Sequence, residues 1–167
     1  FGKGNVYFRT IVTRGEIDRV GLDVASEKKP TLVHIIQHLT DLEEKRAKGM
    51  SLATSKVLRN SARAQDPNIK TSNYLNSLLA LQDARARGAE DAVMCDAEGF
   101  VTEGTTFSIF GVSEAGTLIT PSLEVGILDS ITRRHVIRVA KAQGLKLEEG
   151  FHSLSAFLSC REVFAAS

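Results

Sequence analysis

A single lysine, Lys70, lies between a turn signal and an apolar segment. The turn signal is Asp66-Pro67-Asn68, and the apolar segment covers residues 75–86. We expect a strand before this junction and a helix after it, and side chains at such junctions project into clefts. In a partly dry cleft a lysine can lose its proton and act as an amine nucleophile. Lys70 is therefore a candidate for covalent chemistry, against the background that most lysines are solvated surface charges.

Two further stretches carry groups that are suited to chemistry. Glu103 ends an otherwise apolar strand pattern, where a charged carboxylate is costly unless it is paired. The alternative interpretation is a strand end that is turned to water. Residues 126–133 contain a glycine loop that leads into a helix at Ser130. Free backbone N–H groups at that helix start would form an anion site, or Ser130 is an ordinary N-cap.

The histidines and cysteines give no metal pattern. His34 and His38 are four residues apart, a spacing that suits a metal on a helix, but they lie in or after an apolar strand pattern without a third ligand. We therefore predict no metal site. Cys95 and Cys160 are far apart in the sequence. They indicate buried thiols in a reducing compartment, which is the cytoplasm.

The composition is that of a globular protein. The chain has 167 residues, of which 43% are hydrophobic and 25% are charged, with a formal net charge of +1. This charge does not indicate a nucleic-acid or membrane partner, and no apolar run approaches the roughly 18 residues of a membrane span. The sequence begins directly in a strand pattern and stops just after another, so we expect a fragment of a longer enzyme.

The hydrophobic patterns alternate between strand and helix periods, which predicts an α+β fold. Residues 16–30 read as a loop and residues 39–49 as a short helix or linker, with a domain boundary near residues 40–50. The strand predictions are residues 5–14, 31–37 (buried), 52–59, 92–95, 100–103, 107–112, 117–120, 145–149 and 162–166. The helix predictions are residues 75–86, 130–144 and 153–158.

The two longer predicted helices each have an apolar side. In the first, Leu75, Leu78 and Leu79 form the apolar positions, and Ala80 and Ala84 form a side of small residues. The apolar side of the second consists of Ile131, Val136, Val139 and Ala140.

The order of motifs along the chain resembles one enzyme family. It reads Lys-x-x-x-Tyr-Leu-x-x-x-Leu-Ala, Gly-Ala-x-Asp-Ala-Val, Asp-x-Glu-Gly-x-Val-x-Glu-Gly and Gly-Ile-Leu-x-x-Ile-Thr-Arg. This order is similar to that of the class IV aminotransferases, the fold-type IV pyridoxal-phosphate enzymes. The family includes branched-chain and D-amino-acid aminotransferases and aminodeoxychorismate lyase. The resemblance runs from about Tyr7 to Phe164.

This resemblance implies a fold and a division into domains. The sheets would be mixed and largely antiparallel, forming a pseudo-barrel with packed helices. Residues 49–167 would form the large cofactor-binding domain, incomplete at its C-terminal end. Residues 1–48 would be the remnant of a smaller N-terminal α/β domain together with the interdomain linker. The resemblance also implies a homodimer.

The resemblance further implies roles around pyridoxal 5′-phosphate. Lys70 would bind the cofactor covalently and carry the proton between the substrate α-carbon and the cofactor. Glu103 would face the pyridine nitrogen and keep it protonated. Tyr74 would hydrogen-bond the phenolic oxygen, and Leu128 would pack on the ring face.

The phosphate would be bound at the start of the second long helix. There, Ile131 and Thr132 would donate backbone N–H groups, and the Thr132 hydroxyl would add another donor. Arg59 would help to order the site, or would be a surface arginine. Two positions depart from the family pattern, since Ser108 replaces the usual Asn and Ser130 the usual Gly.

The substrate prediction depends on the first strand. Tyr7 and Arg9 match the Tyr-x-Arg strand of branched-chain aminotransferases, and residues two apart in a strand point to one face. The alternative is two exposed strand residues. The match favours transamination between a branched-chain L-amino acid and a 2-oxo acid. An aminodeoxychorismate lyase, a D-amino-acid aminotransferase and a truncated non-catalytic domain remain as alternatives.

Overall fold

The computed structural model describes residues 5–17, 21–22, 29–39, 43 and 47–167. The chain divides into two compact units, Phe1–Gly49 and Met50–Ser167. The domain boundary predicted from the sequence lies one residue away from this division. That the first unit is the remnant of a smaller domain stays a prediction. No helix among the described residues is both long and apolar enough to cross a membrane.

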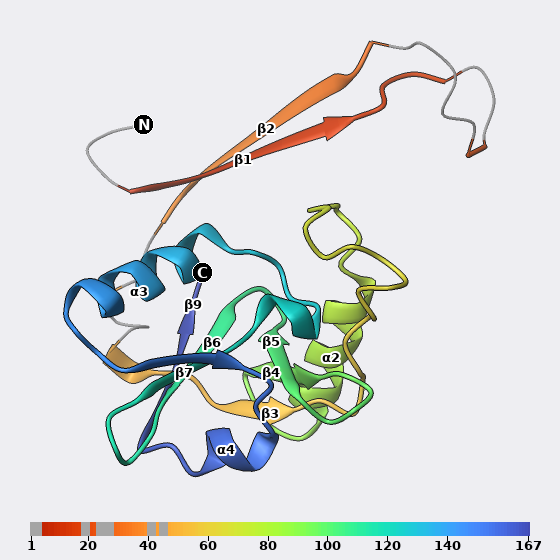
Figure 1. The fold of residues 1–167 in the computed structure, drawn as a ribbon. Helices are drawn as coiled ribbons and strands as arrows, with labels where there is room; N and C mark the ends of the chain where they lie inside the picture. Colours follow the sequence, from red (N-terminus) through yellow and green to blue (C-terminus); the bar gives the residue numbers. More distant parts are fainter. Residues whose placement is uncertain (1–4, 18–20, 23–28, 40–42, 44–46) are drawn as a thin grey trace. The chain divides into compact units, whose positions relative to one another are not determined.

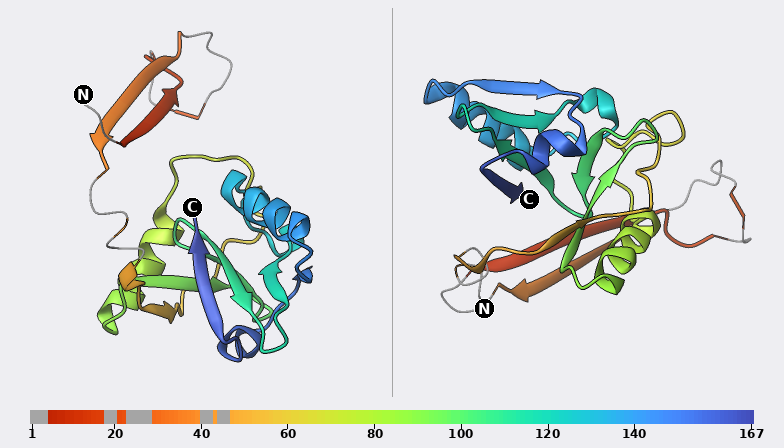
Figure 2. Two further views of the ribbon diagram at one scale, coloured as in Figure 1. Left: turned by 90° about the vertical axis from the view of Figure 1, so that its left-hand side faces the viewer. Right: turned by 90° about the horizontal axis from the view of Figure 1, so that it is seen from below.

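The first unit contains an antiparallel pair of strands, β1 (Val6–Thr13) and β2 (Thr31–His38), in register from Val6↔His38 to Thr13↔Thr31. Figure 2 shows the two strands side by side along their length. Both strand predictions are confirmed, but the predicted burial of residues 31–37 is wrong, because β2 is almost entirely exposed. A two-stranded sheet with no second layer among the described residues of its unit leaves its faces open. The loop and linker predicted at 16–30 and 39–49 lie largely outside the described residues.

The second unit contains two mixed sheets. One has the order β3-β4-β5, in which β3 and β4 are parallel and β4 and β5 antiparallel. The other has the order β8-β7-β6-β9, in which only β7 and β8 are parallel. The predicted α+β class with mixed, largely antiparallel sheets is therefore confirmed. The strands are β3 (Leu52–Thr54), β4 (Asp91–Cys95), β5 (Val101–Gly104), β6 (Ser108–Val112), β7 (Leu118–Pro121), β8 (Leu147–Gly150) and β9 (Glu162–Ala166).

Helices surround these two sheets (Figure 1). The helical segments are α2 (Leu75–Ala86), η1 (Leu123–Val125, a 3-10 turn), α3 (Ile131–Ala142) and α4 (Leu154–Leu158). The innermost hydrophobic cluster takes residues from both sheets and from α4, and so joins the sheets into one core. Its buried members are Val93, Cys95, Val101, Ile109, Ile119 and Phe157.

Helix α2 packs on β4 through alanines rather than leucines. Ala80 and Ala84 are fully buried against Ala92 and Met94 of β4. The predicted apolar positions of this helix (Leu75, Leu78 and Leu79) are exposed by 44–61%. Small side chains let the helix approach the strand closely, so the predicted small-residue side is the one that packs on β4.

The packing face of α3 also differs from the prediction. Of the four predicted apolar positions, Ala140 is buried and Val136 packs against the core, but Ile131 and Val139 are 78% and 45% exposed. Arg133 and Ile137, which were not predicted, are buried as well. Burial of an arginine is tolerated because its Nη2 donates to Pro121 O at 2.7 Å and pairs with a glutamate of β8 at 2.9 Å. The buried face of α3 is therefore rotated from the apolar side that was read from the sequence.

The strand predicted at residues 52–59 ends early, at Thr54. Beyond it, the Ser55 hydroxyl accepts a hydrogen bond from Val57 N at 2.9 Å, and the Asp83 carboxylate accepts one from Lys56 N at 2.9 Å. These side-chain acceptors take backbone donors that a longer strand would need for its ladder. The chain therefore continues as a long loop, residues 55–74, between β3 and α2.

Candidate active site

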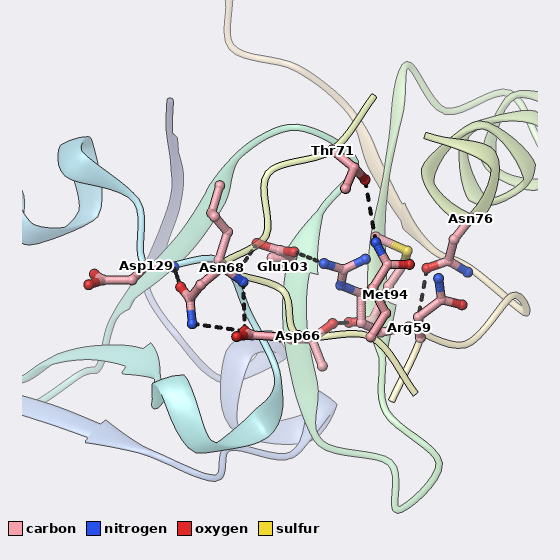
Figure 3. A network of polar contacts seen from close by, with 12 residues as sticks. Arg59, Asp66, Asn68, Thr71, Asn76, Met94, Glu103 and Asp129 are labelled. Atoms are coloured by element: carbon pink, nitrogen blue, oxygen red, sulfur yellow. Dashed lines mark hydrogen bonds and ion pairs between the residues drawn. The ribbon is translucent and has the colours of Figure 1, made fainter. Parts of the chain in front are cut away.

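The loop 55–74 is fixed to β4 and to the first turn of α2. Arg59 N donates to Cys95 O at 2.8 Å. Asn76, in α2, accepts from Asn60 N at 3.2 Å through its Oδ1 and donates to Leu58 O at 2.8 Å through its Nδ2. One side-chain amide thus binds the backbone on both sides of Arg59 and holds this arginine at the end of β4 (Figure 3).

Arg59 and Glu103 form an ion pair with an Nη2–Oε1 distance of 2.7 Å. The two side chains are only 17% and 12% exposed, so water screens their attraction weakly. Glu103 is therefore a paired carboxylate at the end of β5 rather than a strand end turned to water. The Nε atom of Arg59 is buried and has no hydrogen-bond partner among the described residues.

Four influences act on the Glu103 carboxyl. Burial is the largest and raises the pKa of Glu103 above its ordinary value. The Arg59 guanidinium, the backbone N–H of Leu128 at 3.4 Å and the charge of Lys70 all oppose this rise in pKa. The structure thus brings Arg59, Lys70, Glu103 and Leu128 of the predicted site into one electrostatic neighbourhood.

The start of α3 presents free backbone donors. Ser130 is the N-cap, in an extended conformation (φ −69°, ψ 133°), and its hydroxyl accepts from Arg133 N at 3.3 Å. This conformation is open to any residue, which explains how a serine can replace the glycine usual in the resembling family. The N–H groups of Ile131 and Thr132 have no acceptor among the described residues. Helix α3 therefore begins with donors suited to an anion.

The remaining predicted residues lie in less enclosed places. Lys70 is exposed on the loop 55–74, so the expected partly dry cleft at a strand–helix junction is not found around it. Tyr74 is the N-cap of α2 and is 40% exposed. Tyr7 and Arg9 lie in β1, opposite Gln37 and Ile35. Because β1 belongs to the first unit, the role of these two residues in binding the substrate stays a prediction.

The comparison with protein families is decisive. The model of the family described as "Amino-transferase class IV" matches residues 1–167. The chain belongs to the class IV aminotransferases. It is 37% identical over 160 residues to a putative branched-chain-amino-acid aminotransferase of Methanocaldococcus jannaschii. The aligned region covers 96% of this chain and 54% of that protein. It is 29% identical over 164 residues to the aminodeoxychorismate lyase of Bacillus subtilis, with coverages of 96% and 53%.

A solved structure agrees with the family. The branched-chain amino acid aminotransferase of Thermobaculum terrenum, in its PLP form, superposes with a TM-score of 0.77 at 32% identity, over 96% of this chain and 52% of that one. The fold of this class IV aminotransferase is thus fold-type IV, as predicted. The chain spans about half the length of the relatives it matches.

Side-chain and backbone groups of the second unit fit the family's cofactor, pyridoxal 5′-phosphate. They offer an amine (Lys70), a buried carboxylate (Glu103) and free N–H groups at the start of a helix. The amine can bind the aldehyde of the cofactor covalently, the carboxylate can pair with its ring nitrogen, and the N–H groups can bind its phosphate. The unpartnered Nε of Arg59 adds a buried donor beside Glu103.

Two residues that organise the site were not predicted from the sequence. The Asn76 side chain hydrogen-bonds the backbone on both sides of Arg59, and Asn68 Oδ1 accepts a hydrogen bond from Asp129 N at 3.1 Å. Asn68 was noticed only as part of a turn signal. Its partner lies 61 residues further along the chain, and no spacing rule within a single element connects the two.

Proposed function

We propose that this class IV aminotransferase catalyses the pyridoxal-phosphate-dependent transfer of an amino group between a branched-chain L-amino acid and a 2-oxo acid. The observation that supports this most strongly is the buried Glu103 carboxylate, paired with Arg59 and within reach of the charge of Lys70. A largely enclosed carboxylate at the end of an apolar strand, paired with an arginine and acted on by the charge of a lysine, serves chemistry better than it serves stability.

When bound, pyridoxal phosphate withdraws electrons from the substrate α-carbon and stabilises the negative charge that forms there. In this proposal Lys70 holds the cofactor and carries a proton to and from that α-carbon through its Nζ. Because the Lys70 side chain is exposed, its amine can reach both the cofactor and the substrate α-carbon. Glu103 holds a proton at the pyridine nitrogen, and Arg59 and Leu128 N–H keep the carboxylate oriented.

The other residues of the second unit bind and orient. The free N–H groups of Ile131 and Thr132, with the Thr132 hydroxyl, bind the phosphate at the positive end of the α3 dipole. Leu128 packs its side chain on the ring face. Tyr74, at the start of α2, donates to the phenolic oxygen.

The substrate assignment depends on the first unit and on the relatives. Tyr7 and Arg9 lie two positions apart on β1 and so share one face. We propose that this face contributes to the binding of the amino acid. The names of two relatives, both branched-chain aminotransferases, favour branched-chain L-amino acids as substrates.

The setting of the enzyme is part of the proposal. We propose a cytoplasmic homodimer in which the first unit is the remnant of a smaller domain. Family likeness supports the dimer, and the free thiols of Cys95 and Cys160 are consistent with a reducing compartment. Sedimentation analysis of the protein tests the dimer directly.

A half-reaction tests the proposed activity. Protein loaded with pyridoxal phosphate and mixed with L-leucine should yield the corresponding 2-oxo acid and pyridoxamine phosphate, one equivalent per site. Failure with every L-amino acid, together with pyruvate release from aminodeoxychorismate, would support a lyase instead, which the similarity to the B. subtilis lyase favours as the second candidate. A protein that never takes up pyridoxal phosphate would support the non-catalytic alternative.

We expect Arg59→Met to change the pH dependence of this reaction. Without the guanidinium, the pKa of Glu103 rises further, because burial then acts with less opposition. Glu103 must be ionised to hold the pyridinium, so the acid limb of the kcat/KM profile should move to higher pH. The matched control is Arg63→Met, which removes an exposed arginine of the same loop. An acid limb that stays at its wild-type position would show that Arg59 does not govern Glu103.

A further inference from the structure

Two successive backbone N–H groups connect the parts of the site. Leu128 N donates to Glu103 Oε2 at 3.4 Å, and Asp129 N donates to Asn68 Oδ1 at 3.1 Å. Asn68 lies two residues before Lys70, and Asp129 lies two residues before Ile131. The segment that leads into α3 is thus hydrogen-bonded both to the Glu103 carboxylate and to the loop 55–74, which carries Lys70 (Figure 3).

The orientation of the Asn68 side chain is fixed by Asp66. Asp66 Oδ1 accepts from Asn68 N at 2.9 Å and from Asn68 Nδ2 at 3.2 Å. Because the amide nitrogen is used on Asp66, the amide oxygen is the atom that faces Asp129 N. The turn Asp66-Pro67-Asn68 therefore forms a rigid support for a single acceptor, although the Asp66 and Asn68 side chains are exposed.

The same two loops approach each other at a second place. A Cβ atom added at Gly126 would lie 3.3 Å from the Cβ of Ala62. Gly126 has φ +88°, which a side chain would strain, so the glycine allows the loops to lie this close. The loop 55–74 therefore approaches the segment before α3 near Gly126 as well as at the Asn68–Asp129 hydrogen bond.

We propose that Asn68 is a positioning residue that fixes the separation between Lys70 and the start of α3. This inference rests on the proposed function. A rigid cofactor that joins covalently to Lys70 and places its phosphate at Ile131 and Thr132 requires a constant distance between these two points. Small errors in such placement are costly for rate. Asn68 supplies the only hydrogen bond between residues 66–70 and 126–132 in the described part of the chain.

The test compares Asn68→Ala with Asn60→Ala. Asn60 lies in the same loop, and its side chain makes no hydrogen bond to the described residues, so the control removes an amide without removing the contact. In cofactor-free protein, hydrogen exchange at residues 126–130 should become about 2- to 10-fold faster in Asn68→Ala, the factor expected for one lost hydrogen bond. In loaded protein kcat should fall about 10-fold, while KM for the amino acid stays nearly constant.

A rescue variant separates position from general stability. The double substitution Asp66→Asn and Asn68→Asp exchanges the amide and the carboxylate. The amide nitrogen of residue 66 can then donate to one carboxylate oxygen of residue 68, which reverses the direction of the side-chain hydrogen bond, and the second carboxylate oxygen can accept from Asp129 N. It should restore most of kcat. Faster exchange without any loss of kcat, or a loss that the double substitution does not reverse, would overturn the role of Asn68.

The proposed function can fail separately. If the wild-type protein takes up no pyridoxal phosphate, the function itself is contradicted. If the wild-type protein takes it up and Asn68→Ala matches both Asn60→Ala and wild type in exchange and in kcat, only the role of Asn68 is contradicted.

Discussion

Replacing Lys70 by alanine is expected to lower kcat by about 10⁴-fold. Loss of a positioned proton-transfer group alone lowers the rate by about 10²- to 10⁴-fold, and the covalent attachment of the cofactor should disappear as well, so we expect the upper end of this range. The measurement has two parts. Transamination of L-leucine gives the rate, and borohydride reduction followed by peptide mass mapping shows whether pyridoxal phosphate is attached to the peptide that contains residue 70.

The fold should survive this change. Lys70 is exposed on its loop, and surface substitutions of this kind usually change stability by less than about 0.5 kcal/mol. Lys56→Ala is the control, because Lys56 is an exposed lysine of the same loop whose backbone N–H keeps its hydrogen bond to Asp83. Attachment of the cofactor to a lysine other than Lys70, or activity in Lys70→Ala close to that of Lys56→Ala, would refute the assignment.

Local patterns predicted most elements of the second unit. The helix 75–86 and the strand 162–166 have the bounds that were read from the sequence, because each shows one clear period between breakers. The strand 52–59 failed because Ser55 and Asp83 capture backbone donors, and the second of these acceptors is distant in sequence. The apolar side of α3 was predicted only in part, with Val136 and Ala140 on the core, because a buried ion pair made Arg133 a core residue, which hydrophobicity alone cannot foresee.

The site divides in the same way. Lys70, Glu103 and the helix start at Ile131 carry sequence signals of their own, so they could be named individually. The partners that connect them, Arg59 with Glu103 and Asn68 with Asp129, join different loops and strands. Tertiary packing creates such pairs, and a single sequence holds no periodic trace of them. The chemistry of the site was therefore more predictable than the supports that hold it.

Glu103→Gln is the second substitution with a large expected effect. The amide has the size of the carboxylate but no charge, so it cannot hold a proton on the pyridine nitrogen. We expect kcat to fall about 10²- to 10³-fold, the usual loss when one preorganised electrostatic contact is removed. Cofactor attachment should persist, because Lys70 and the start of α3 are unchanged. Steady-state rates and the absorbance of the bound cofactor measure the two effects separately.

The control for this substitution is Glu98→Gln, in the exposed turn between β4 and β5, which should keep the wild-type rate. A rate of Glu103→Gln within threefold of that of the control would contradict the assigned role. The double variant with Arg59→Met adds a sharper criterion. If Arg59 acts only through the Glu103 carboxylate, the double variant should be no slower than Glu103→Gln alone, because residues that act as one unit are not additive. A further loss in the double variant would mean that the buried Nε of Arg59 has its own contact with the cofactor or substrate.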